Sequence, residues 1–110
     1  MMVLVLVEDL MFRSRLEAHL SQRGVPHEAA APRHLRETLQ RVTPTHVVVN
    51  LAEASPDDLA VLADLPVHVL GFGPHVDRAR FLGARRLGAQ VVANSALESR
   101  LAPFAAEEAT

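Results

Sequence analysis

Short continuous runs of apolar residues alternate along the chain with longer segments in which apolar residues recur at helical spacing. A continuous apolar run of this length is typical of a strand that is covered on both faces. The predicted strands are residues 2–7, 25–30, 45–51, 66–72 and 90–93. We expect the second strand to lie near an edge of the sheet, because Pro26 has no N–H group to donate to a neighbouring strand.

Segments with helical spacing follow each of these strands. In the first of them Phe12, Leu16 and Leu20 share one face. Gly24 then supplies the residue that ends the helix. After the third strand, Ser55 is placed to cap a helix whose first turn contains a proline. The predicted helices are residues 10–23, 32–42, 55–64, about 75–87, and a last one that begins at 95.

Two connections near the end of the chain contain residues that predict local structure, one a turn and the other a helix cap. Gly71 and Gly73 follow the fourth apolar run and predict a flexible turn, since the third glycine of a dinucleotide-binding loop is missing. Ser95 and Glu98 have the spacing of a capping box. We therefore expect Ser95 to be the N-cap of the last helix.

Five strand–helix repeats with short connections indicate an α/β fold with a parallel sheet. We expect a doubly wound (βα)5 arrangement, in which five parallel strands have helices on both faces. The 110 residues match the commonest size of one domain. Residues 1–110 are therefore interpreted as a single domain, and the Ala- and Glu-rich tail after about residue 104 is expected to fray.

Composition narrows the classes of function. The chain has no cysteine, which excludes disulfides, thiolate metal sites and cysteine nucleophiles. Its formal net charge is -2 without a long run of one sign, so neither nucleic acid nor a membrane surface is indicated as a partner. No apolar stretch approaches the roughly 20 residues of a membrane helix, and the apolar start lacks the basic residues of a signal peptide. We expect a soluble, cytoplasmic protein.

Polar residues follow the predicted strands at their carboxyl ends, where ligands gather in an open α/β sheet. Glu8 and Asp9 follow the first strand, and Asn50 stands where the third strand ends. An aspartate beside such an acidic pair would make a phosphorylatable, magnesium-binding site, but this chain supplies an amide. It also has no lysine, because all 11 basic residues are arginine. This combination favours a binding or signalling module over an enzyme.

Four short segments occur in an order and spacing that resemble the receiver domains of two-component response regulators, over nearly the whole chain. They are residues 7–9 (VED), 47–51 (VVVNL), 65–71 (LPVHVLG) and 87–95 (LGAQVVANS). In that family the corresponding segments supply an acidic pair that helps to hold magnesium, the phosphoacceptor aspartate, a Thr or Ser, and a Lys. The resemblance implies a flavodoxin-like topology with strand order 2-1-3-4-5 and a role in signal transduction.

The departures from the family's pattern concern its chemistry. Asn50 replaces the phosphoacceptor, and an amide cannot form an acyl phosphate. Gly71 replaces the hydroxyl that would bind the phosphoryl group, Ser95 replaces the lysine, and Val92 stands where the family has a switching aromatic. We therefore expect a pseudo-receiver that is not an enzyme and that acts by protein–protein interaction without phosphorylation.

The acidic pair Glu8 and Asp9 has two interpretations. It can be a weak Mg²⁺ site with the Asn50 carbonyl oxygen as a third ligand, because Mg²⁺ prefers oxygen ligands and keeps several waters. It can also be a polar end to the strand, with Asp9 capping the first helix, and this interpretation is favoured. An arginine of a partner protein that reaches into the acidic pair is a third possibility.

Arginines on the fourth and fifth helices predict the surface that meets a partner. Arg78 and Arg85 share a helix face at a spacing of seven residues, with Arg86 beside them and Arg100 on the last helix. Such a stripe can bind an acidic partner, or it can be a solvated helix face. The resemblance implies another signalling protein as the partner, or a homodimer through the last helices.

Two other functions are consistent with the same fold. A weakly phosphorylatable regulator in a phosphorelay would accept phosphate at Glu8, Asp9 or Asp57. A small flavodoxin-like cofactor-binding protein is the other alternative, although the first loop lacks the hydroxyl-rich stretch expected for a flavin phosphate.

Of the histidines, His46 and His68 lie on strands that we expect to be neighbours. Buried, hydrogen-bonded histidines are favoured there over a metal pair.

Overall fold

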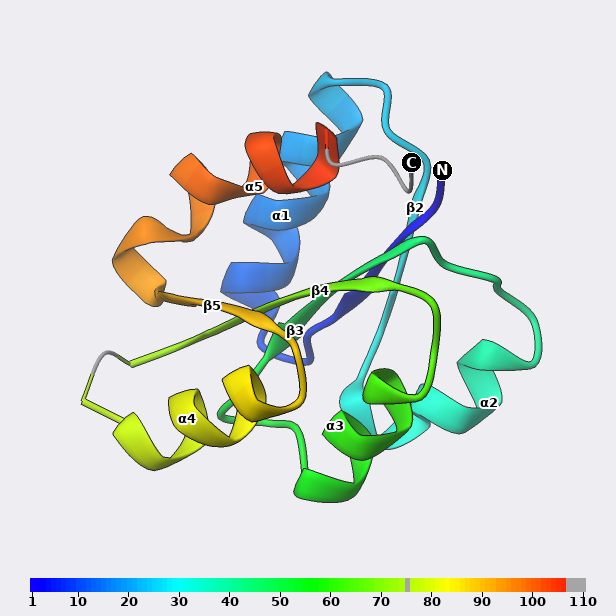
Figure 1. Ribbon diagram of the computed structural model, residues 1–110. Helices are drawn as coiled ribbons and strands as arrows, with labels where there is room; N and C mark the ends of the chain where they lie inside the picture. The colour runs from blue at the N-terminus through cyan, green and yellow to red at the C-terminus, as the bar shows by residue number, and fades with distance from the viewer. Residues whose placement is uncertain (75, 107–110) are drawn as a thin grey trace.

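The computed structural model describes residues 1–74 and 76–106. A five-stranded parallel sheet runs through its centre, with helices on both faces (Figure 1). The strands are β1 (Val3–Leu6), β2 (His27–Ala30), β3 (His46–Asn50), β4 (His68–Gly73) and β5 (Gln90–Ala93). Their order is β2-β1-β3-β4-β5. The predicted fold class and strand order are confirmed, including the edge position of the second strand.

The described residues contain five α-helices and two short 3-10 turns, of which the last turn and the last helix follow the final strand. The helices are α1 (Leu10–Gln22), α2 (Leu35–Leu39), α3 (Pro56–Ala63), α4 (Arg78–Arg86) and α5 (Leu97–Ala106). The 3-10 turns are η1 (Pro32–His34) and η2 (Asn94–Ala96). None of the described helices has the length and apolar character needed to cross a membrane.

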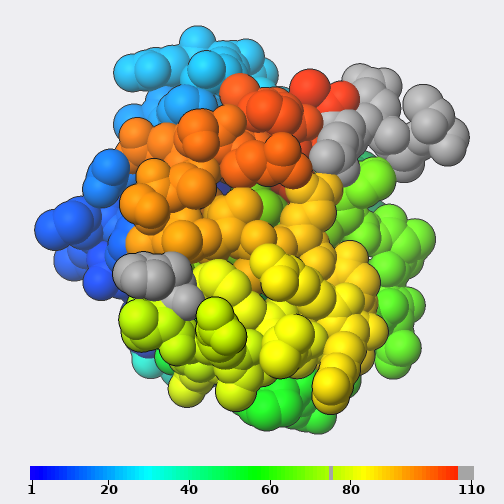
Figure 2. Space-filling view, turned by 60° about the vertical axis from the view of Figure 1, so that its left-hand side comes forward, coloured from blue at the N-terminus to red at the C-terminus, as the bar shows by residue number. Residues whose placement is uncertain are grey.

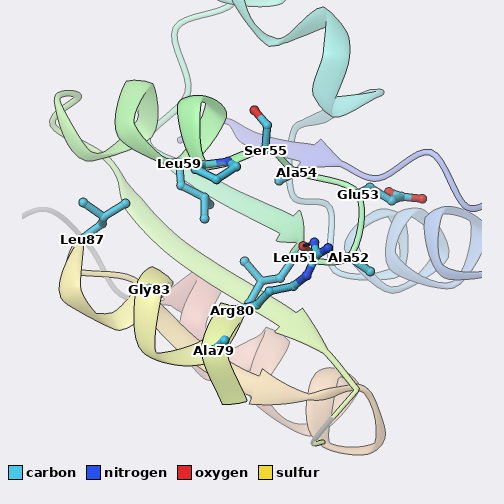
Figure 3. Close-up of a pocket in the computed structure, with 11 residues that line it drawn as sticks. Leu51, Ala52, Glu53, Ala54, Ser55, Leu59, Ala79, Arg80, Gly83 and Leu87 are labelled. Atoms are coloured by element: carbon cyan, nitrogen blue, oxygen red, sulfur yellow. Dashed lines mark hydrogen bonds between the residues drawn. The ribbon is translucent and has the colours of Figure 1, made fainter. Parts of the chain in front are cut away.

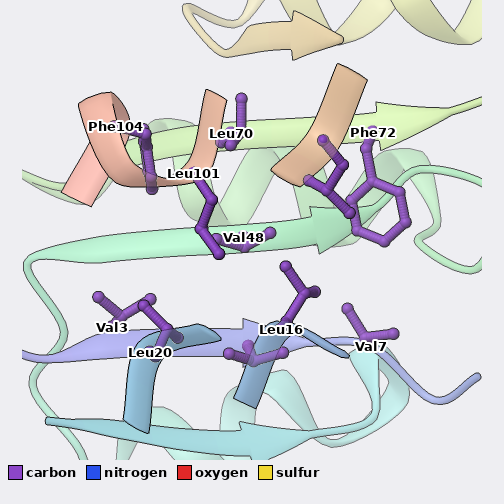
Figure 4. Close-up of a cluster of buried hydrophobic side chains, with 11 residues drawn as sticks. Val3, Val7, Leu16, Leu20, Val48, Leu70, Phe72, Leu101 and Phe104 are labelled. Atoms are coloured by element: carbon purple, nitrogen blue, oxygen red, sulfur yellow. The ribbon is translucent and has the colours of Figure 1, made fainter. Parts of the chain in front are cut away.

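The face of the sheet under α1 and α5 forms the first of two hydrophobic cores. Leu16 and Leu20 of α1 and Phe104 of α5 pack onto strand residues such as Val48 and Phe72 (Figure 4). Leu16 and Leu20 are two of the three residues that the helical spacing placed on one face, and both are fully buried. Phe12, the third, is partly buried against the same core.

The opposite face of the sheet forms the second core, under α2, α3 and α4. Leu4, Val47 and Val49 project to this face from the strands. Leu35 of α2 and Leu62 of α3 cover them. Successive residues of β1 and β3 thus point to alternate cores, which explains why these strands read as continuous apolar runs.

Local signals explain where several helices begin and end. Asp9 caps α1, and Ser55 and Asp58 form a complete capping box at the start of α3. The predicted caps at both positions are therefore confirmed. Gly24 and Gly88 follow the helices α1 and α4 with φ of 67° and 91°, a backbone conformation that glycine adopts at low cost.

Three predicted elements differ in the structure. The segment predicted as a helix over residues 32–42 is a 3-10 turn followed by only five residues of α-helix. The predicted Gly71–Gly73 turn is wrong, since β4 continues through Gly73. The predicted Ser95 N-cap is also wrong, because the chain passes from β5 directly into η2, so Ser95 lies inside that turn.

The ends of two predicted elements fall on residues that the structure leaves undescribed. The fourth helix was expected from about residue 75, and α4 begins at Arg78 with Asp77 as its N-cap. Helix α5 continues to Ala106, with Phe104 and Ala105 buried. The expected fraying after about residue 104 does not begin there, because residues 105 and 106 belong to α5, and residues 107–110 lie outside the described residues.

Candidate functional site

The candidate site lies at the carboxyl ends of β1, β3 and β4, with Asn50 at its centre. Asn50 is the last residue of β3 and is only 6% exposed. Its side-chain Oδ1 accepts a hydrogen bond of 3.0 Å from the backbone N–H of Ala52. The amide is therefore engaged in the turn that follows its own strand, as expected for an Asn at a strand end.

The acidic pair after β1 is engaged in structural contacts. One carboxylate oxygen of Asp9 accepts hydrogen bonds from the backbone N–H groups of Met11 and Phe12, at 2.9 and 3.2 Å. The carboxylate of Glu8 forms an ion pair with Arg33. The first helix and a neighbouring cation thus use the charges that a metal ion would need.

Glu53 is a third carboxylate at this edge of the sheet, and the sequence analysis missed it. Its two oxygens accept hydrogen bonds from the backbone N–H groups of Glu8 and Asp9, each at 2.8 Å. Glu53 therefore ties the connection after β3 to the connection after β1. Its position three residues beyond Asn50, at the same edge of the sheet, is the sequence signal that could have revealed it.

These contacts bear on the expected magnesium site. Among residues 1–74 and 76–106, no three or more His, Cys, Asp or Glu side chains are grouped so that they could hold a metal ion. The helix cap uses only Oδ1 of Asp9, and Arg33 contacts Oε1 of Glu8, so a bound Mg²⁺ would compete with Arg33 for the charge of Glu8. Weak Mg²⁺ binding by Glu8 and Asp9 remains a prediction.

Gly71 lies within β4, and the side chain of Leu51 covers it. A Cβ atom added at Gly71 would lie 2.9 Å from Leu51 Cδ2 and 3.0 Å from Leu51 Cγ. Leu51 is almost completely buried, and its N–H donates to the carbonyl oxygen of Phe72 at 2.9 Å. The space beside β4 that a hydroxyl-bearing side chain at position 71 would need is therefore taken by Leu51.

Arg80 of α4 holds the connection after β3 from the other side. Its Nη1 donates to the carbonyl oxygen of Leu51 at 2.6 Å, and its Nε lies 2.9 Å from Asp77 Oδ2. Leu51 is thus bound through its N–H to β4 and through its carbonyl to α4. The sequence analysis did not predict this contact, because it joins residues that are 29 positions apart.

The other two positions that depart from the family's pattern lie on β5 and just after it. Val92 is paired with Phe72 in the strand register and packs against the first core. The Phe72 ring lies 5.1 Å from that of Phe12. Ser95 is exposed within η2. The structure therefore brings Val92 onto the core face, while Ser95 stays at the surface.

His46 and His68 are adjacent, as the sequence predicted, since the register of β3 and β4 pairs them. Their rings stack with centroids 4.9 Å apart. His46 is buried, its Nδ1 lies 2.8 Å from the Thr45 hydroxyl, and its ring meets Phe104 edge-on at 5.3 Å. His46 therefore belongs to the core, whereas His68 is only partly buried.

The predicted partner surface is an arginine-rich face of α4 beside β5 and α5. Arg78, Arg85 and Arg86 are exposed, and Arg100 of α5 donates to the Gln90 side chain of β5 at 2.9 Å. The exposed Leu82 lies between Arg78 and Arg85, and with Phe81 these residues line a shallow hollow. In Figure 2, the yellow α4 and the orange start of α5 face the viewer on the same side of the molecule.

A larger groove of about 570 Å³ lies between the connection after β3, the helix α3 and the helix α4. Leu51, Ala54 and Leu59 line it on one side, and Arg80 and Gly83 line it on the other (Figure 3). This groove was not predicted from the sequence, because it depends on how α3 and α4 are spaced on the sheet.

Comparison with known proteins shows the fold of this chain. A scan against protein-family models finds no match, and a search of the curated proteins finds no significant match. Several solved structures are similar to this chain over most of its length. A response regulator from Thermotoga maritima has 16% sequence identity and a TM-score of 0.75, and the match covers 96% of this chain and 98% of that one.

Two further structures give the same result. The receiver domain of NtrX from Brucella abortus has 18% identity and a TM-score of 0.76, with 96% of this chain and 94% of that chain covered. The receiver domain of Ssk1 from Saccharomyces cerevisiae, crystallised with the histidine phosphotransfer protein Ypd1, has 10% identity and a TM-score of 0.78 over 96% and 88% of the two chains. This chain therefore has the flavodoxin-like fold of receiver domains.

Proposed function

We propose that this protein is a receiver-like signalling domain that acts by binding another protein and does not depend on phosphorylation. The observation that carries the proposal is Asn50, an amide at the carboxyl end of β3 whose Oδ1 is bound to the N–H of Ala52. An amide nitrogen is a poor nucleophile and cannot form an acyl phosphate. A domain that binds one conformation of its partner shifts the partner's equilibrium without any phosphate.

The surroundings of Asn50 support the same proposal. Leu51 occupies the space beside Gly71, where the family's pattern places a hydroxyl. Glu53 and Arg80 tie the connection after β3 to its neighbours by hydrogen bonds within the chain. These contacts order the connection without a phosphoryl group or a metal ion.

The arginine-rich face of α4 supports a choice of partner chemistry. Helix α4 contains four arginines and no acidic residue, and the exposed Leu82 lies between Arg78 and Arg85. We infer that the partner presents carboxylates around an apolar side chain, because buried apolar anchors and arginines contribute most of the affinity of such contacts. The Ssk1 receiver domain, crystallised with Ypd1, is a precedent for a protein partner on this fold.

A homodimer is the second candidate partner. A two-fold dimer centred on α4 would place the arginines of one copy against those of the other, because a two-fold interface uses the same patch twice. Like charges in such an arrangement repel each other. We therefore favour a different, acidic protein over a second copy of this chain.

Affinity capture from the cells that make the protein tests the proposed surface. The Arg78→Ala/Arg85→Ala variant should lose about tenfold or more of the captured partner, since arginines at an interface centre are worth more than 1 kcal/mol each. Arg23→Ala/Arg41→Ala is the matched control, because it removes the same charge from exposed positions elsewhere. Unchanged capture by the first variant, or capture that requires acetyl phosphate, would refute the proposal.

A further inference from the structure

We propose that the groove between α3 and α4 binds an uncharged small molecule that has an apolar body and one carbonyl oxygen. This site lies on the other side of α4 from the hollow around Leu82, so it goes beyond the proposed partner surface. The proposal rests on the size of the groove, on its lining and on its balance of charge.

The size and lining fit an apolar molecule of modest size. A volume of about 570 Å³ lies within the range of small-molecule sites. Small residues such as Ala54, Ala79 and Gly83 leave the hollow between the two helices. Leu59 of α3 and Leu87, which follows α4, lie on the side of the groove away from Glu53 (Figure 3), so the apolar body of a ligand would lie there.

The opposite end of the groove offers hydrogen-bond donors. The guanidinium of Arg80 reaches the Leu51 carbonyl there (Figure 3). Its contacts with Leu51 and Asp77 engage Nε and Nη1, whereas an arginine carries five N–H donors. The side chain of Arg80 is 49% exposed, so its remaining donors can reach a carbonyl oxygen of a ligand.

The charges at this end favour a carbonyl over a carboxylate or a phosphate. Asp77 already balances the charge of Arg80 at 2.9 Å. Glu53 also lines the groove, although its carboxylate points away from it toward the N–H groups of Glu8 and Asp9 (Figure 3). Because Asp77 already balances the charge of Arg80, a ligand carboxylate or phosphate would add an unbalanced negative charge beside Asp77, whereas a neutral acceptor avoids that repulsion.

Titration with the fluorescent ketone acedan tests whether the groove binds such a molecule. The chain has no Trp or Tyr, so the probe is read without background emission from the protein. We expect a saturable blue shift of the probe with a Kd of roughly 10 μM to 1 mM, typical of a small ligand of this size. Absence of saturable binding up to about 1 mM would overturn the proposal.

Variants locate the probe in the groove. A Cβ at Gly83 would meet no atom within 4 Å, so Gly83→Leu should fold, which circular dichroism checks, and should fill part of the groove. We expect Gly83→Leu to weaken acedan binding about tenfold or more. Ala60→Leu is the matched control, because Ala60 is exposed on α3 and does not line the groove. Equal binding by wild type and Gly83→Leu would overturn the proposal.

The role of the carbonyl is tested with ligands of the same shape. Acetylnaphthalene and isopropenylnaphthalene, substituted at the same ring position, differ mainly in the oxygen. In amide NMR titrations we expect the ketone to bind about fivefold more tightly and to shift resonances of residues 51–55 and 79–87. Equal affinity for the two ligands, tighter binding of naphthoate, or shifts confined to other residues would each overturn the assignment.

Discussion

At the residue scale, Leu51 and Gly71 are adapted to each other. Leu51 follows Asn50 directly and folds over β4, where Gly71 has no side chain to obstruct it. Leu51 is nearly fully buried, so its apolar surface contributes to the second core. The absence of a side chain at position 71 therefore has a packing role beside Asn50.

Gly71→Ser should destabilise the protein by about 1–3 kcal/mol, because its Cβ would approach the Leu51 side chain too closely. Leu51→Ala alone should cost about 2–5 kcal/mol through the cavity it leaves. The double variant should be more stable than the sum of the two losses predicts, since the smaller residue makes room for the serine. Urea unfolding followed by circular dichroism measures all three, and simple additivity would contradict the account.

The sequence revealed part of the candidate site. Glu8, Asp9 and Asn50 were predicted to share one edge of the sheet, because polar residues that end parallel strands meet there. The contacts of Glu53 with the backbone after β1, and of Leu51 with Gly71, were not predicted. The position of Glu53 three residues after Asn50 indicates the same edge of the sheet, but its partners and those of Leu51 depend on how the connection after β3 folds back over neighbouring strands.

At the scale of elements, hydrophobic patterning predicted the strands and helices well, while single capping motifs were less reliable. Ser55 and Ser95 have similar sequence signals, yet only Ser55 caps a helix. Ser55 itself has an extended backbone just before α3, which lets its side chain cap the helix. By contrast, β5 runs straight into a 3-10 turn that contains Ser95. The tertiary path of the chain decides which of two local motifs forms.

Glu53 links two connections, and its removal should loosen both. In Glu53→Ala the N–H groups of Glu8 and Asp9 lose their acceptor. We expect a loss of about 1 kcal/mol, since the groups are exposed enough for water to replace part of the contact. Amide hydrogen exchange should accelerate at residues 8 and 9, while Glu37→Ala, an exposed change on α2, should leave it unchanged. Equal protection in Glu53→Ala and wild type would show that the bridge is absent in solution.

At the scale of the whole molecule, stability depends on two cores that share one sheet. Phe104 is fully buried in the first core and touches His46 across it. Phe81 of α4 is only partly buried against the second core. The two aromatic residues therefore lie on opposite faces of the sheet, and Phe104 is more deeply buried than Phe81.

Phe104→Ala should cost about 3–5 kcal/mol, because it removes a large, fully buried side chain. A small domain has only about 5–15 kcal/mol of stability in total, so this variant should be close to unfolding at room temperature. Phe81→Ala should cost clearly less, since part of its ring is already in water. Thermal unfolding compares the stability lost by the two variants. Equal losses would contradict the difference in burial between Phe104 and Phe81.

We propose that this receiver-like domain functions without a phosphoryl group, because β3 ends on the amide of Asn50 and contacts within the chain order its surroundings. Intact mass spectrometry after incubation with acetyl phosphate and Mg²⁺ tests it most directly, with Asn50→Asp as the reference chain that restores a carboxylate. We predict that the wild-type mass stays unchanged under conditions that saturate ordinary phosphoacceptors. A phosphoryl group on the wild-type chain, at Glu8, Asp9, Asp57 or any other residue, would contradict the account.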